Sequence, residues 1–117
     1  MSYSLLEAVS PRAASLDDLF TVPAGYTAHV ASIAICNVSG TPRVVRLAFV
    51  KGGGTINAAH YVLYDAPLPV GYTLEWGLAQ PLTLAASDTI RIYADTANVA
   101  FSVFGELEQS GVSLVAG

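Results

Sequence analysis

Hydrophobic and polar residues alternate along most of the chain from Leu19 to Glu108, and turn residues interrupt the alternation. Between Arg43 and Lys51, for example, Val45, Leu47 and Phe49 point to one face of an extended segment and Arg46 points to the other. Alternation of this kind predicts half-buried β-strands. Strands are expected at residues 19–22, 27–37, 43–51, 60–65, 72–76, 82–85, 89–94 and 99–108.

About eight short strands with regularly spaced turns are typical of a sandwich or a barrel. The sequence therefore predicts an all-β fold, a single antiparallel β-sandwich that is jelly-roll-like and occupies residues 18–110. The inward positions of the longest strands should form its core. These positions are Ile33, Ile35, Leu47, Phe49, Ile90, Ile92, Phe101 and Val103.

The two ends of the chain lack this alternation. Residues 1–17 are predicted to form an N-terminal arm, partly extended, and residues 111–117 an apolar, uncharged C-terminal tail. Helical spacing occurs only at Ser4–Val9, which is too short for a helix that is stable alone. The arm should stay loose until a partner supplies an apolar groove for Tyr3, Leu5, Leu6 and Val9.

Charged residues are unusually scarce. They make up 12% of the chain, against about 25% in an average soluble domain, while hydrophobic residues make up 53%. Such a composition favours a protein that buries surface against partners, and a homotrimer is expected. The alternative is a monomer whose surface is rich in Thr and Ala.

The charge pattern argues against two classes of partner. The net charge is −4 with only five Lys and Arg residues, so the basic stripe of a nucleic-acid-binding protein is absent. Apolar runs are shorter than the roughly 20 residues that span a bilayer, and no membrane partner is expected. The first ten residues lack a positive segment and a long apolar segment, which predicts synthesis without Sec export. Cys36 is the only cysteine and therefore forms no intrachain disulfide.

Candidate catalytic and metal-binding residues are few. His29 and Cys36 should face opposite sides of one strand unless a bulge intervenes, and His60 stands alone. Glu106 and Glu108 share a face, but both are expected to be solvated, whereas a catalytic pair needs two different environments. Neither a G-x-S-x-G motif nor a phosphate-binding loop occurs. We therefore predict no enzymatic activity, no metal and no cofactor.

Aromatic residues carry more information. Tyr61, Tyr64, Tyr93 and Phe104 occupy strand positions, and Tyr93 and Phe104 are out of phase with the core residues of their strands. Aromatic side chains that face away from a core suit a protein interface, which is the favoured interpretation. Carbohydrate stacking is a second interpretation, and partial covering of both sheet faces within one chain is a third.

Three stretches give the chain a family resemblance: LFTVPAGYTAHVASIAICNVSGTPR, then RLAFV with a Gly-rich loop, then LAASDTIRIYA with VAFSVFGELE. Over residues 19–108 the chain resembles small β-sandwich virion proteins of tailed bacteriophages. The turn before Thr89 is often A-G-D-T in such proteins, whereas Ser87 replaces the Gly here. The resemblance supplies no catalytic residues.

The resemblance implies a capsid decoration (cement) protein, commonly trimeric, that binds and stabilises the phage head. It would be made in the cytoplasm of the host bacterium and located in the virion. Its partners would be other copies of itself and the major capsid protein or another virion protein. A tail, fibre or baseplate component is the first alternative. A carbohydrate-binding module, with aromatics on one concave face, is the second, and an enzyme would need a convergent polar pocket.

Overall fold

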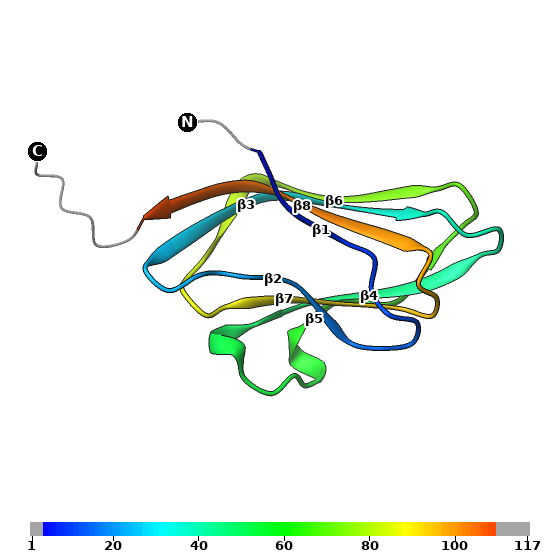
Figure 1. Ribbon diagram of the computed structural model, residues 1–117, viewed down its shortest axis with the longest axis horizontal. Coiled ribbons are helices and arrows are strands. Elements are labelled where there is room, and N and C mark those ends of the chain that lie inside the picture. The colour runs from blue at the N-terminus through cyan, green and yellow to red at the C-terminus, as the bar shows by residue number, and fades with distance from the viewer. Residues whose placement is uncertain (1–3, 110–117) are drawn as a thin grey trace, which may run out of the picture.

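The computed structural model describes residues 4–109, except for the side chains of residues 78–81. Eight antiparallel strands in this range form two four-stranded sheets that pack face to face (Figure 1). The first sheet has the order β1–β8–β3–β6 and the second the order β2–β7–β4–β5. The strands are β1 (Ser4–Val9), β2 (Asp17–Thr21), β3 (Tyr26–Asn37), β4 (Arg43–Val50), β5 (Tyr61–Leu68), β6 (Thr73–Leu84), β7 (Thr89–Ala94) and β8 (Val99–Gln109). This is the strand order of a jelly roll, and the predicted all-β sandwich is confirmed.

The core lies between the sheets and is built from the alternation seen in the sequence. Of the eight predicted core residues, all but Phe49 are fully buried. Phe49 is partly buried and packs against the core, with its ring centroid 5.2 Å from that of Trp76. Period-2 alternation thus identified the inward face of the long strands correctly.

The prediction and the structure both have eight strands, but two predicted strands are one strand in the structure and one observed strand was not predicted. Residues 73–76 and 82–84 of the two segments predicted as separate strands belong to the single strand β6. Gly77 and Pro81 lie between these two segments, and both residue types often interrupt a strand. However, β6 lies at the edge of the first sheet, where a proline without an N–H donor is tolerated. The strand that keeps the total at eight is β1, which was not predicted and lies within the predicted arm.

Residues of the predicted arm form part of the sandwich. Ser4–Val9 is an extended strand that pairs with β8, with Leu5 opposite Phe104 and Val9 opposite Phe101. Leu6 and Val9 are partly buried against the core. The apolar partner of this segment is therefore the edge of its own first sheet. Tyr3 and the predicted tail 111–117 lie outside the described residues.

A β-bulge at Ala31 changes which side chains share a face. Val30 pairs with Gly105 and Ser32 pairs with Phe104, which leaves Ala31 as an extra residue in β3. The extra residue reverses the phase, so His29 and Cys36 both point away from the core, which corrects the expectation of opposite sides. Seven positions along a strand still separate them by about 23 Å, too far for one metal ion.

The segment between β4 and β5 lies against the outer side of the second sheet (Figure 1). It contains two short 3-10 turns, η1 (Lys51–Gly53) and η2 (Ala58–His60). Across residues 4–109, no helix is long and apolar enough to cross a bilayer.

Asp88 joins the start of this segment to the turn before β7. Its side chain is 7% exposed, and its carboxylate accepts hydrogen bonds from the backbone N–H of Gly52 (2.8 Å) and of Ala85 (2.9 Å). The Lys51 ammonium lies 3.6 Å away. Burial raises the pKa of Asp88, but the two N–H groups and Lys51 outweigh burial, so the pKa lies below its ordinary value.

We expect Asp88→Asn to destabilise the fold at pH 7 by about 1–3 kcal/mol, because an amide cannot accept from both N–H groups. The lowered pKa means that the carboxylate stabilises the fold above the ordinary pKa of Asp. This contribution is lost as the pH falls through the lowered value. Urea unfolding from pH 7 to pH 2 should therefore show a weaker acid-induced loss in the variant. Asp18→Asn, at an exposed ion pair, is the control and should change stability little. Parallel pH profiles for wild type and Asp88→Asn would contradict the assignment.

Candidate functional site

The outer face of the second sheet carries an arginine between two tyrosine rings. Arg46 on β4 pairs in register with Tyr93 on β7, and Tyr64 comes from β5 on the other side. The guanidinium carbon of Arg46 lies 4.1 Å from the centroid of the Tyr64 ring and 4.4 Å from that of Tyr93. Cation–π contacts of this kind hold both rings in defined positions.

Asp65 neutralises this arginine. Arg46 Nε donates a hydrogen bond of 2.6 Å to Asp65 Oδ1, and this bond raises the pKa of the guanidinium above its ordinary value. Asp65 has a φ of 51°, a left-handed conformation, at an irregularity in the register between β4 and β5. The irregular backbone brings consecutive residues, Tyr64 and Asp65, to the same arginine.

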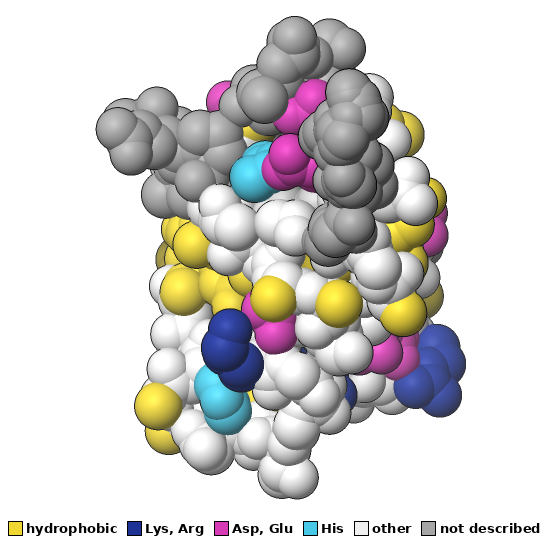
Figure 2. Space-filling model, turned by 90° about the vertical axis from the view of Figure 1, so that its left-hand side faces the viewer, with side chains coloured by type: hydrophobic (Ala, Val, Ile, Leu, Met, Phe, Trp, Pro, Cys, Tyr) yellow, Lys and Arg dark blue, Asp and Glu magenta, His cyan; other side chains and the backbone are white. Residues whose placement is uncertain are grey.

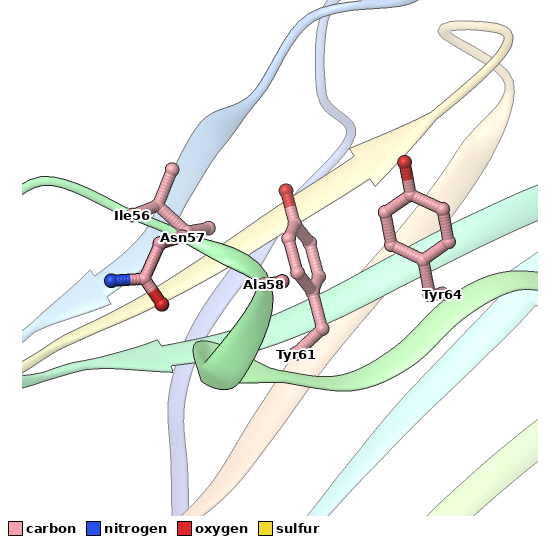
Figure 3. Close-up of a pocket in the computed structure, with 5 residues that line it drawn as sticks. All are labelled: Ile56, Asn57, Ala58, Tyr61 and Tyr64. Carbon is pink, nitrogen blue, oxygen red and sulfur yellow. The ribbon is translucent and has the colours of Figure 1, made fainter.

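The segment 51–60 covers part of this face and creates a pocket. Ala48 and Val50 are out of phase with the core positions of β4, yet both are buried, since the η2 turn contacts β4 and the η1 turn contacts β7. Beside them is a pocket of about 500 Å³. Figure 3 shows the Tyr61 ring between the segment 56–58 and the ring of Tyr64. The lining residues are Ile56, Asn57, Ala58, Tyr61 and Tyr64.

The pocket walls are fixed by local contacts. The rings of Tyr61 and Tyr64 meet edge to face with centroids 4.9 Å apart. Asn57 caps the η2 turn: its Oδ1 accepts from the N–H of Ala59 (2.9 Å), and its own N–H donates to His60 Nδ1 (2.9 Å). His60, which the sequence left without a role, therefore helps to shape the turn beside the pocket.

The outer face of the first sheet is different, because its central row of side chains is uncharged. Leu5, Phe104, Ser32 and Gly77 lie in one row across the four strands, because each is the register partner of the next. Leu5 is 54% exposed. The next two rows hold Ala8, Ser102, Ala34 and Glu75, then Ala100, Cys36 and Thr73.

The two sheets also differ in charge. All five Lys and Arg residues of the sequence lie within the described part of the chain, and each is 2.6–3.9 Å from an aspartate at the second sheet or its flanking turns. The end of the sandwich in Figure 2 is mostly uncharged, and acidic side chains lie beside the basic ones. Among residues 4–109, the acidic side chains without a Lys or Arg partner are on strands of the first sheet. They are Glu7, Glu75, Glu106 and Glu108.

One polar cluster lies at the end of the first sheet. His29 Nε2 is 2.9 Å from Glu108 Oε1, and Thr83 Oγ1 is 3.3 Å from His29 Nδ1. A hydroxyl, an imidazole and a carboxylate in series are the parts of a nucleophilic triad. The cluster lies on an open sheet surface, however, where β3 and β8 are each paired on both sides. Their backbone N–H groups are committed to the sheet and do not form an oxyanion hole.

Glu106 and Glu108 flank this histidine, with Glu106 directly opposite His29 in register. Only Glu108 is bonded to the imidazole, so the two carboxylates have different surroundings, whereas the sequence indicated that both are solvated. In the described part of the chain, no three His, Cys, Asp or Glu side chains are grouped to hold a metal ion.

Comparison with known proteins finds no family model and no curated protein that matches this chain. The functional interpretation of the site therefore depends on its geometry alone. The structure brings Tyr61, Tyr64 and Tyr93 together on the second sheet, while Leu5 and Phe104 share the outer face of the first.

Sequence reasoning missed two parts of the site. Arg46 was assigned to an outward position but not to the tyrosines, and no role was assigned to the segment 56–58. The sequence did contain one signal for this contact: the alternation places both Arg46 and Tyr93 on faces that point away from the core. Nothing in the sequence alone indicates that residues 51–60 turn back over the sheet.

Proposed function

We propose that this chain is a non-enzymatic structural protein of a tailed-phage particle, most simply a decoration protein of the head. It attaches through the outer face of its first sheet. The observation that carries this proposal is the arrangement of that face: an exposed Leu5 beside Phe104, small uncharged neighbours, and glutamates around them. Jelly rolls also build viral capsid domains, which is an analogy at the level of the fold.

The glutamates on this face indicate what kind of partner surface it can bind. Glu75 lies at one edge of the uncharged centre, and Glu106 and Glu108 lie at one end of it. Two such faces repel each other, so this face is unsuited to contact with a second copy. It fits a partner surface that is apolar in the centre and basic at the rim, which is the chemistry we assign to the major capsid protein. A homotrimer, if formed, uses other surfaces. A tail, fibre or baseplate partner of the same chemistry is the alternative.

We expect Leu5→Glu to weaken binding to phage heads at least tenfold. The substitution removes an apolar contact worth about 1.5–3 kcal/mol when fully buried and adds a like charge to the acidic rim. Wild-type binding should also weaken as salt rises, because rim charges are screened. The measurement is co-sedimentation of the purified protein with heads that lack it, at low and high ionic strength.

Val62→Glu is the matched control, since Val62 is an exposed apolar residue on an edge strand of the other sheet. It should leave binding unchanged, and both variants should fold because both positions are exposed. Equal binding by wild type and Leu5→Glu would refute attachment through the first sheet. Failure of the wild-type protein to bind heads, with binding to tails instead, would favour the tail alternative.

A further inference from the structure

We propose that the pocket between Tyr61, Tyr64 and the segment 56–58 binds a neutral pyranose ring of an oligosaccharide. This inference goes beyond attachment to a particle, because it concerns the second sheet, on the opposite side of the sandwich. A single chain can therefore be attached by one face while the other face holds a ligand.

The size and walls of the pocket suit a small organic ring. Its volume of about 500 Å³ lies within the range of small-molecule sites. Its apolar walls are the side chains of Ile56 and Ala58 and the rings of Tyr61 and Tyr64. Tyr64 is 59% exposed although Arg46 and Tyr61 already hold its ring. A rigid, exposed aromatic surface gives a ligand contact area at little cost in side-chain entropy.

The electrostatics disfavour charged ligands. A cation on the Tyr64 ring would meet the Arg46 guanidinium, which lies 4.1 Å from the ring centroid. An anion would find the same guanidinium already paired with Asp65 at 2.6 Å. The other Lys and Arg side chains are likewise paired with aspartates. The preferred ligand is therefore uncharged.

The polar groups of the pocket select an amphipathic ligand over a purely apolar one. The lining offers the hydroxyl groups of Tyr61 and Tyr64, which both donate and accept. Figure 3 shows both hydroxyls pointing to the same side. The Oδ1 of Asn57 is occupied by the N–H of Ala59, so its Nδ2 group supplies the remaining donors. A pyranose ring presents a C–H face to an aromatic wall and hydroxyl groups at its rim, which matches apolar walls with a few neutral polar groups.

The proposal is tested by isothermal titration calorimetry of the full chain with three neutral probes, cellohexaose, maltohexaose and mannohexaose, and one anionic probe, hexagalacturonic acid. We expect at least one neutral probe to bind, and at least tenfold more tightly than the anionic probe. Tyr64→Ala and Tyr61→Ala should each weaken that binding at least tenfold. Tyr64→Phe, which keeps the ring and loses the hydroxyl, should weaken it about threefold.

Tyr72→Ala is the matched control, because Tyr72 is a comparably exposed tyrosine outside the pocket. It should change the affinity less than twofold. Asp65→Asn tests the charge argument: it frees the Arg46 charge and should increase affinity for hexagalacturonic acid at least threefold. Asn is among the residues that tolerate the left-handed conformation at this position.

The proposal is overturned if none of the neutral probes binds, if the anionic probe binds best to the wild type, or if the Tyr61 and Tyr64 variants bind as the wild type does. Its failure is separable from that of particle attachment. Leu5→Glu should leave the affinity for sugar unchanged, and Tyr64→Ala should leave binding to heads unchanged.

Discussion

Replacing Gly105 by Ala is expected to destabilise the sandwich by more than about 3 kcal/mol. A Cβ atom at this position would lie 2.2 Å from the carbonyl oxygen of His29 and 3.0 Å from the Cα of Val30. Both are backbone atoms of β3, the central neighbour of β8, and they cannot rotate away as a side chain can. The strands would have to separate beside the bulge at Ala31, so the cost should exceed the usual 1–3 kcal/mol of overpacking.

Gly77→Ala is the matched control within the same sheet. Its added Cβ would meet only the Cβ of Ser32, at 4.0 Å, which is an ordinary contact. Thermal unfolding followed by circular dichroism should show a midpoint at least about 10 °C lower for Gly105→Ala and nearly unchanged for Gly77→Ala. A midpoint for Gly105→Ala within about 3 °C of the wild type would mean that β3 and β8 leave room for a Cβ atom at position 105.

The close contact between Gly105 and β3 joins two strands that are far apart in the sequence, and contacts of this kind could not be predicted from the sequence. Within one strand, alternation depends only on neighbours along the chain, so Ile33 and Ile35, or Phe101 and Val103, could be placed in the core by counting. A bulge depends on the strand opposite. No residue near Ala31 indicates the bulge. The sequence therefore favoured opposite faces for His29 and Cys36, and only the structure shows that the bulge brings both to the outer face.

The N-terminal strand shows a second limit. Residues 4–9 look like a loose arm when read alone, because Leu5 and Leu6 are adjacent and no alternation is complete. Their partner, β8, lies about a hundred positions further along the chain. The edge of β8 lets residues 4–9 bury apolar surface that offsets the entropy cost of ordering them. Only the order of strands in the sheet shows that this edge is available.

The sequence predicted which residue types form the candidate site, but not which of them lie next to one another in the structure. Phase counting assigned Tyr93 and Arg46 to outward positions, and the structure adds that they adjoin each other with Tyr64 beyond. The division of charge between the two sheets was also invisible in the net value of −4, because it depends on which strands share a sheet. The proposals for the two faces therefore rest on topology as much as on composition.

Replacing Asn37 by Asp is the second substitution with a large expected effect. Asn37 is 2% exposed, and its Nδ2 group donates to the carbonyl oxygens of Thr41 (2.9 Å), Leu68 (3.0 Å) and Pro69 (3.3 Å). Its Oδ1 accepts from the N–H of Ser39 at 2.9 Å. One side chain thus joins the turn after β3 to the end of β5 at one end of the sandwich.

A carboxylate at position 37 would place a negative charge among those three carbonyl oxygens, and we expect a loss of about 3–5 kcal/mol at pH 7. Burial should raise the pKa of the introduced carboxyl above its value in the unfolded chain, about 3.9. The charge penalty is therefore complete above the raised pKa and disappears as the pH falls below about 3.9. Below that pH, the protonated carboxyl can donate to one of the carbonyls.

Urea unfolding at pH 7 and pH 3 measures both parts of this prediction. The difference in unfolding free energy between wild type and Asn37→Asp should be smaller at pH 3. Asn98→Asp introduces the same charge at an exposed residue of the neighbouring turn, whose backbone carbonyl accepts from Val38. That control should stay within about 0.5 kcal/mol of the wild type at pH 7. If both variants lose equal stability, general repulsion in an acidic protein accounts for the effect, and Asn37 does not join the two turns in the way its hydrogen bonds indicate.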